Sequence, residues 1–567
     1  MSGEANGDAD DEDAASREAE ETAGAGESDE RGNRGEPDDH GESVVDALFS
    51  VTGGAAVVVT GTLAGMALEL SGRGLFTRAF SPDEYGLFSL AFTVASILAV
   101  VATLGLRNGV TRQVAYHGAG GAEGADGSAE GSKSGSAGRP APDETALTPA
   151  SIVTWGLAAA VVASLAVCAG LFALAEPLAS LFGHPEYALA FRVAAVSIPG
   201  LAVVRVCTAV FRGFGRTRER VAFQELLQKG ALPAILAAVV WAEWGLIAAL
   251  LAFPASLALT AVAYLLYTVR ADPGGFRGAA VASLRRPREG YALLAFSFPL
   301  LFASLLIQIM SWTDILMLGY FKTAAAVGIY DGVRPLVRTI SIIWGSMIFL
   351  YTPAVSEFAA EGSGEAVRRV YFALTKWFAS VTFPVATTFL LFPEVVLGAV
   401  FGPEYRAGAL ALRVLAVAYF LGNVMGPNGA TLTALGYTRA VMWANLVAAV
   451  GNVALNVWLI PPHGIVGAAV ATAVALVVRN AIRVVLVYRF SGAHSLRAPM
   501  LVPMGITVAA AVLAARAAGD AVASPLGLVP FLAGLFAVYY GAMVGLGYAE
   551  PADRELLARV RGRLTRR

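Results

Sequence analysis

The chain has few charged residues for its length and very little cysteine or lysine. Charged residues make up 15% of the 567 residues, against 56% hydrophobic residues and a mean hydropathy of +0.63. This composition excludes an ordinary soluble protein and predicts one that crosses a membrane many times. The two cysteines, Cys168 and Cys207, lie in apolar runs, so we expect buried thiols and neither a disulfide nor a metal site.

Two motifs are missing from the sequence, and each absence narrows the possible functions. No Gly-x-x-x-x-Gly-Lys-[Ser/Thr] sequence occurs, so we do not expect the chain to hydrolyse ATP. The N-terminus lacks the basic start and apolar core of a signal peptide, so the first membrane segment is expected to direct insertion. The few lysines and the acidic N-terminal tail are typical of a salt-loving prokaryote.

Apolar runs broken by Gly, Pro and charged clusters predict an all-α membrane protein with about fourteen transmembrane helices. Arg-rich loops follow the even-numbered spans, as at 212–220 and 270–288, so both termini are expected in the cytoplasm. The predicted regions are an acidic disordered tail (1–46), a first lobe (47–270) with a flexible cytoplasmic insertion (117–149), a second lobe (271–490), two further spans (491–550) and a basic cytoplasmic tail (551–567).

The sequence contains an internal repeat. A shift of 221 residues places Arg192-Val193 on Arg413-Val414, Gly215 on Gly436, and Thr217-Arg218 on Thr438-Arg439. Because each lobe has an even number of predicted spans, about six, both lobes enter the membrane in the same orientation, and the repeat is parallel. Two matching lobes in a membrane are typical of a transporter whose site lies between them.

Several segments, in this order, resemble the polysaccharide flippases of the multidrug/oligosaccharidyl-lipid/polysaccharide exporter superfamily. They are Thr77 to Phe88 (Thr-Arg-Ala-Phe-Ser-Pro-Asp-Glu-Tyr-Gly-Leu-Phe), Leu104-Gly105-Leu106 with Arg112, Asp314 to Gly319 followed by Val327-Gly328-Ile329-Tyr330, and Asn456 to Pro461 followed by Gly464 to Thr472.

The resemblance implies two six-helix lobes around a V-shaped central cavity, lined mainly by the first, second, seventh and eighth spans, with two additional C-terminal helices. It also implies a cargo of glycan linked to polyprenyl phosphate or polyprenyl pyrophosphate, moved from the cytoplasmic to the outer leaflet of the cell membrane by alternating access, for surface polysaccharide or glycoprotein synthesis. The expected partners are this cargo and the bilayer, and the sequence leaves open whether Na⁺, H⁺ or no ion is coupled to transport. We expect a monomer without cofactor, metal, nucleic acid or catalytic residue.

Charged and polar side chains within those four spans are the candidate site, because ionisable groups in a membrane are costly and usually face a cavity. Arginine suits an anionic cargo, since its planar guanidinium binds phosphate oxygens bidentately and stays protonated. The candidates for substrate binding are Arg73, Arg107, Arg334, Arg338 and Gln308; those for ion coupling or charge balance are Glu69, Asp314 and Asp331. The alternative for each residue is an internal salt bridge, such as Asp331 with Arg334, that only fixes helix contacts.

Other polar residues have simpler interpretations. Long side chains near span ends reach the headgroups, which is the expectation for Arg78, Arg112, Arg212, Arg479 and Arg483. Glu225 and Lys229 are spaced to support a helix, and Asn445, Asn452 and Asn456 are expected to hydrogen-bond between helices.

Two other functions compete with the flippase. A cation-coupled drug or metabolite antiporter of the same superfamily shares the two-lobe plan, but arginine outnumbers acid in the candidate cavity. A membrane glycan polymerase or ligase is expected to carry a long outer loop with paired carboxylates or a histidine, and every predicted outer loop is short. The sequence therefore favours a transporter over an enzyme.

Overall fold

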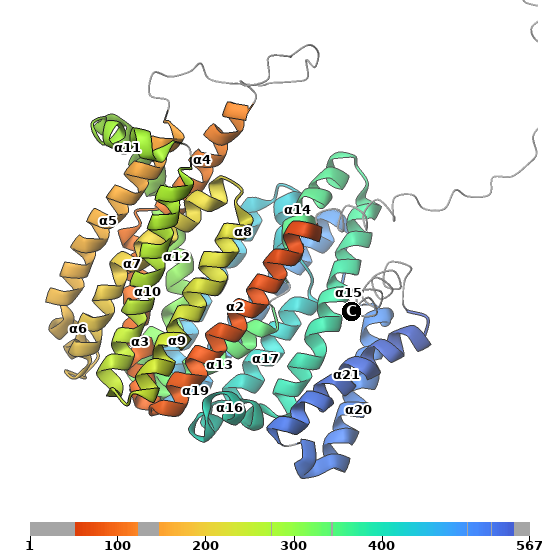
Figure 1. Cartoon of the computed structure of the whole chain (residues 1–567). Helices are drawn as coiled ribbons and strands as arrows, with labels where there is room; N and C mark the ends of the chain where they lie inside the picture. Colours follow the sequence, from red (N-terminus) through yellow and green to blue (C-terminus); the bar gives the residue numbers. More distant parts are fainter. Residues whose placement is uncertain are drawn as a thin grey trace, which may run out of the picture. The chain divides into compact units, whose positions relative to one another are not determined.

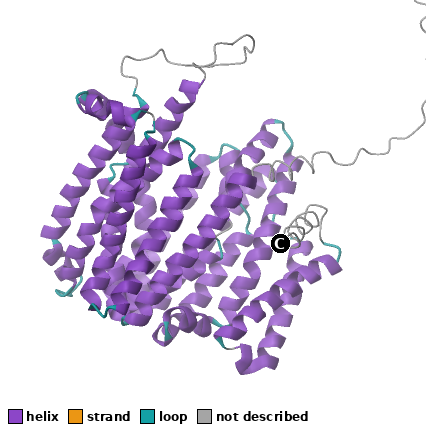
Figure 2. Ribbon diagram, in the orientation of Figure 1, coloured by secondary structure: helices purple, strands orange, loops and turns teal. Residues whose placement is uncertain are grey.

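The computed structural model describes residues 52–122, 147–273, 275–341, 344–495, 497–522 and 524–548. The predicted acidic tail (1–46), most of the predicted insertion (117–149) and the predicted basic tail (551–567) lie outside these residues. Within them the chain is helical, with short connections and no strand (Figure 2).

The first half of the chain forms one group of helices, the N-terminal group (Figure 1). Its members are α2 (Thr52–Ala79), α3 (Pro82–Ala102), α4 (Leu106–Ala122), α5 (Pro149–Ala173), α6 (Ala175–Leu181), α7 (Tyr187–Gly213), α8 (Thr217–Arg220), the π-helix η1 (Val221–Leu227), α9 (Gln228–Trp241), α10 (Gly245–Ala271) and α11 (Phe276–Leu284).

The second half forms the C-terminal group, followed by two helices that pack on α15 and α16. The group comprises α12 (Pro287–Phe321), α13 (Ala324–Thr339), α14 (Trp344–Ala360), α15 (Gly364–Leu391), α16 (Pro393–Phe401), the 3₁₀-helix η2 (Pro403–Gly408), α17 (Ala409–Val424), α18 (Asn428–Ala434) and α19 (Thr438–Ser491); the added helices are α20 (Ala498–Val522) and α21 (Pro525–Gly545).

Ten of the described helical segments are long and apolar enough to cross a membrane. One of these, α19, bends at Gly464, where two predicted spans meet. The predicted first, seventh and eighth spans, which carry most of the candidate charges, are not among the ten. The structure therefore confirms an all-α membrane protein, and the count of fourteen spans stays a prediction.

The internal repeat is visible in the backbone. Gly215 and Gly436 both have a positive φ, at 68° and 84°, and each ends the helix before the next one begins. Glycine adopts this left-handed conformation without the steric cost that a Cβ would add. The same residues thus turn the chain in the same way in both halves.

Two predicted spans are broken in the middle, which the sequence analysis did not expect. The second predicted span (86–114) divides into α3 and α4 at Gly105, and the eighth (327–355) divides into α13 and α14 after Ile340. A Cβ on Gly105 would lie 2.0 Å from the Ser297 carbonyl oxygen of α12, so only glycine permits this approach. At the other break, the Asn423 side chain donates a hydrogen bond of 2.8 Å to the Ile340 carbonyl.

The N-terminal halves of α3 and α13 pack directly against each other. A Cβ on Gly86 would lie 1.7 Å from the Ala324 carbonyl oxygen, and one on Gly328 would lie 2.3 Å from the Pro82 carbonyl oxygen. The Asp83 carboxylate also accepts a hydrogen bond of 3.0 Å from the Ala325 amide. This contact joins the two groups at the end of the bundle where α6 and α16 lie (Figure 1), here called the α16 end; the opposite end carries α11.

Candidate functional site

Helix α2 positions Arg73 by packing closely on η1 and α9. A Cβ on Gly65 would lie 2.7 Å from the Glu225 carbonyl oxygen, and one on Gly72 would lie 3.3 Å from Pro233 Cδ. Small residues at such contacts let membrane helices approach closely. The close contact therefore sets the position of Arg73, which follows Gly72.

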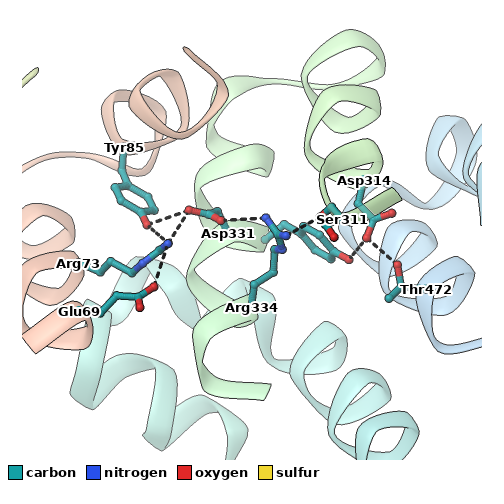
Figure 3. A network of polar contacts seen from close by, with 9 residues as sticks. Glu69, Arg73, Tyr85, Ser311, Asp314, Asp331, Arg334 and Thr472 are labelled. Carbon is teal, nitrogen blue, oxygen red and sulfur yellow. Dashed lines mark hydrogen bonds and ion pairs between the residues drawn. The ribbon is translucent and has the colours of Figure 1, made fainter. Parts of the chain in front are cut away.

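Arg73 forms an ion pair with Asp331 of α13, across the two helix groups (Figure 3). Its Nη1 lies 2.7 Å from Asp331 Oδ2, and the Tyr85 hydroxyl of α3 donates to the same oxygen at 3.0 Å. Asp331 is 4% exposed, so water screens this pair little. A carboxylate from the second half of the chain thus holds a cation and a hydroxyl from the first half.

Arg334 shares Asp331 with Arg73. Its Nη1 lies 3.4 Å from Asp331 Oδ1, its Nη2 donates to the Ser311 carbonyl at 2.6 Å, and its guanidinium carbon lies 4.4 Å from the centre of the Trp312 ring. The internal salt bridge considered as the alternative for Arg334 is present. In this conformation Arg334 is held by the protein itself.

These residues belong to a row of six alternating charges that runs from η1 to α13. The successive N to O distances are 2.9, 3.7, 3.4, 2.7 and 3.4 Å for Glu225, Lys229, Glu69, Arg73, Asp331 and Arg334 in that order. Three cations balance three carboxylates, so the row is neutral. We call this set the interlobe ion row.

Asp314 of α12 lies in a different environment, although it is similarly buried at 8% exposure. Its carboxylate accepts hydrogen bonds from Tyr330 OH at 2.8 Å, Asn456 Nδ2 at 2.8 Å and Thr472 Oγ1 at 2.6 Å. No cation pairs with it among the described residues. Asn456 Oδ1, beside it, is buried without a hydrogen-bond partner. This group, here the Asp314 cluster, has a net negative charge and a free oxygen acceptor.

The ion row and the Asp314 cluster are joined by neighbours in the chain. On α13, Tyr330 belongs to the cluster and the next residue, Asp331, to the row. On α12, Asp314 belongs to the cluster, while Ser311 one turn earlier accepts from Arg334. A shift of either helix at one network therefore moves the other (Figure 3).

The remaining predicted site residues lie outside both networks. Arg338, in the last turn of α13, and Arg107, in the first turn of α4, are exposed, and Gln308 is half-buried. Neither arginine forms an ion pair with a described residue. Glu69, which acts electrostatically on Arg338, already pairs with Arg73 and Lys229.

Sequence reasoning missed several members of the site. Tyr85 and Tyr330 stand in the Tyr-Gly and Gly-Ile-Tyr motifs, which served only to identify the family resemblance. Lys229 was expected to support its own helix, which its 2.9 Å pair with Glu225 confirms, but it also reaches Glu69. Thr472 closes the Asp314 cluster, and its place in the motif after Gly464 was the only signal for it.

Comparisons with known proteins identify a family and several relatives. Residues 51–359, more than half of the chain, match the family described as "Polysaccharide biosynthesis protein". The probable low-salt glycan biosynthesis flippase Agl15 of Haloferax volcanii is 31% identical over 173 residues, which is 30% of this chain and 36% of that protein. The matches to curated relatives span between 25% and 36% of those proteins' lengths.

Solved structures show the fold. The lipid II flippase MurJ superposes with a TM-score of 0.62 at 11% identity, over 88% of this chain and 99% of that one. A multidrug resistance MATE family transporter of the MOP superfamily superposes with a TM-score of 0.56 at 15% identity, over 76% and 96% of the two chains. The described helices therefore adopt the fold of these transporters.

Proposed function

The chain belongs to the polysaccharide biosynthesis protein family, and from this premise we propose that it moves a lipid-linked glycan from one leaflet of the membrane to the other. The names of the Haloferax relative and of MurJ support a flippase. Such a cargo combines a lipid chain that stays in the bilayer, an anionic phosphate or pyrophosphate, and a polar glycan that cannot cross hydrocarbon unaided.

The observation that carries the proposal is the interlobe ion row. Arg73 and Arg334 approach one carboxylate, Asp331, from the two helix groups, at 2.7 and 3.4 Å. A phosphate offers the same arginines more negative charge and more acceptor oxygens than Asp331 does. The polyprenyl-linked phosphate therefore competes with Asp331, and its binding weakens the link between the groups. Arg338 and Arg107, which have no ion-pair partner in the described chain, supply further cationic contacts.

Loss of this link allows alternating access. We place the α11 end in the cytoplasm because the Arg-rich connections 212–220 and 270–288 lie there, and both chain termini with it. The α16 end, where α3 packs on α13, is then the closed outer side. Rocking of the two lobes (47–270 and 271–490) separates α3 from α13 and releases the cargo outside.

The Asp314 cluster is the proposed site of ion coupling. A buried carboxylate that no cation of the protein pairs with is suited to bind a coupling cation. Oxygen ligands for Na⁺ are at hand in Asp314, Thr472 and the unpartnered Asn456 Oδ1. Because Tyr330 and Asp331 are adjacent on α13, neutralising Asp314 changes the position of Asp331 and so the strength of the ion row.

The same cluster favours the second candidate function, a cation-coupled drug or metabolite antiporter. That function needs a site for a compact cation, which Asp314 provides. It does not need Arg338 and Arg107, whose charges would repel a cationic drug. The two functions therefore differ in whether these arginines are required.

Flipping in proteoliposomes tests the proposal. A fluorescent polyprenyl-diphosphate disaccharide would be reconstituted with the protein, and its outward movement followed by quenching. The variant Arg334→Ala, Arg338→Ala should slow flipping about tenfold or more, because each lost charged hydrogen bond to phosphate is worth about 1.5 to 3 kcal/mol. Arg489→Gln, at the exposed end of α19, is the matched control and should flip normally.

Two outcomes would contradict the flippase. Wild-type flipping by the double variant would remove these side chains from the mechanism. Ion-driven drug exchange without any movement of the lipid-linked disaccharide would establish the antiporter instead.

A further inference from the structure

We propose that the C-terminal group contains a second anion-binding subsite, formed by Arg479 and Arg483 of α19 with Tyr419 of α17, which takes a carboxylate-bearing sugar of the glycan. The inference rests on the proposed flippase function and extends it to the class of glycan carried. It concerns residues that the sequence analysis placed at the headgroups.

Arg479 and Arg483 lie on one face of α19, four residues apart and so about 6 Å apart along the helix axis. Both side chains are half-buried, and the Nε atom of each is buried without a hydrogen-bond partner. Arg483 Nη2 donates to Asn445 Oδ1 at 2.5 Å, and a Cβ on Gly429 of α18 would lie 3.0 Å from Arg483 Nη1. The Arg483 guanidinium is thus held against protein, which corrects the expectation that it extends to the headgroups.

No carboxylate neutralises this pair among the ion pairs of the described residues. Tyr419 acts electrostatically on Arg479, and Arg479 in turn acts on Arg483. Two cations four residues apart on a helix repel each other, and a partly buried setting screens them poorly. An anionic ligand would relieve this repulsion and supply acceptors for the unpaired Nε groups.

Tyr419 connects this pair to the proposed phosphate site. It acts electrostatically on both Arg338 of α13 and Arg479 of α19, and its helix α17 packs on both of these helices. Arg483 follows Arg479 by one turn, toward the C-terminal end of α19. A glycan attached to a phosphate at Arg334 and Arg338 could therefore extend along these side chains.

The chemistry favours a sugar carboxylate over a second phosphate. The carrier phosphate has its cations in Arg73, Arg334 and Arg338, and the two α19 arginines lie beyond Tyr419. A planar guanidinium binds a planar carboxylate bidentately, and an aromatic ring such as that of Tyr419 offers an apolar face and a hydroxyl to a sugar ring. A hexuronic acid near the phosphate satisfies both groups.

The test compares two fluorescent polyprenyl-diphosphate disaccharides that differ only in the distal sugar, glucuronic acid or glucose. Flipping rates in proteoliposomes give a preference ratio for each protein. Wild type should prefer the glucuronic acid cargo, and Arg479→Gln, Arg483→Gln should lower its rate about tenfold while changing the glucose cargo less than about twofold. Arg489→Gln, farther along the same helix, should keep the wild-type ratio.

Each further outcome has a defined meaning. If wild type moves neither cargo, the flippase function itself fails. If wild type moves both cargoes and the double variant slows both equally, the arginines serve the shared phosphate and the inference is overturned. A double variant with the preference ratio of wild type also overturns it. Should the double variant fail to fold, the single variants Arg479→Lys and Arg483→Lys replace it, because they keep the charge but lose the bidentate geometry. A reduced preference for the glucuronic acid cargo in either variant supports the subsite. A wild-type preference ratio in both variants overturns it.

Discussion

Asp331 and Asp314 are two buried aspartates on adjacent helices of the same group, and their surroundings differ completely. Asp331, 4% exposed, lies between two arginines and a tyrosine, whereas Asp314, 8% exposed, is surrounded by hydroxyl and amide groups. Burial alone therefore does not define a role. A carboxylate held between cations ties helices together, and one held only by dipoles keeps the capacity to take up a cation.

The largest expected effect is the loss of stability when the Asp331 carboxylate is removed. Asp331→Ala leaves the half-buried Arg334 without its carboxylate partner and Arg73 with Glu69 alone, and removing one partner of a buried pair costs about 3 to 5 kcal/mol. Thermal unfolding of the purified protein should therefore occur at a clearly lower temperature. Glu365→Ala, which breaks the exposed pair with Arg369, is the control and should cost about 0 to 1 kcal/mol. Equal effects of the two variants would show that Asp331 holds nothing together.

The second prediction concerns transport and tests Asp314. In Asp314→Asn the shape is kept and the amide oxygen can still accept the hydrogen bonds from Tyr330 and Thr472, so we expect stability to change less than in Asp331→Ala. The variant cannot take up a proton or bind a cation strongly. We expect flipping to become about tenfold slower and independent of Na⁺ and pH, as for the loss of a typical coupling free energy.

The measurement is the flipping rate across a series of Na⁺ concentrations and pH values, for wild type and variant. Glu365→Gln, which removes an exposed charge, should keep the wild-type dependence. Retention of that dependence in Asp314→Asn would place the coupling site elsewhere.

The smallest predicted effects come from two matched tyrosines, each of which donates a hydrogen bond to one of the two aspartates. Tyr330→Phe removes a 2.8 Å hydrogen bond to Asp314, and Tyr85→Phe removes a 3.0 Å hydrogen bond to Asp331. Each loss is worth about 1 kcal/mol. Tyr330→Phe should shift the ion concentration for half-maximal flipping about fivefold, because Asp314 has no cation to compensate. Tyr85→Phe should leave it unchanged, and an equal shift in both would argue that the two aspartates act as one site.

Much of the fold could be predicted from the sequence. Apolar runs and the 221-residue repeat predicted a two-part helical membrane protein, because both signals are local or recur along the chain. The division of the second and eighth spans was missed. It depends on contacts such as Gly105 with the Ser297 carbonyl and Asn423 with Ile340, between residues far apart in the sequence.

The candidate site was predicted in part. The pairs Glu69 with Arg73 and Asp331 with Arg334 follow from helical spacing of four and three residues, so the sequence suffices for them. The expectation for Arg483 was wrong because closeness to the end of a span does not reveal that Asn445 and Gly429 lie against its side chain.

The sequence by itself determined that the chain is a helical membrane protein with repeated halves, and that its intramembrane charges concentrate in the first, seventh and eighth predicted spans. Tertiary structure alone decided how these charges combine. Arg73 and Asp331 are 258 residues apart, and Asp314 and Thr472 are 158 apart, so no local spacing relates them. Electrostatic and hydrogen-bond energies depend on distance in space, which is established only when the folded chain brings α2 to α13 and α12 to α19.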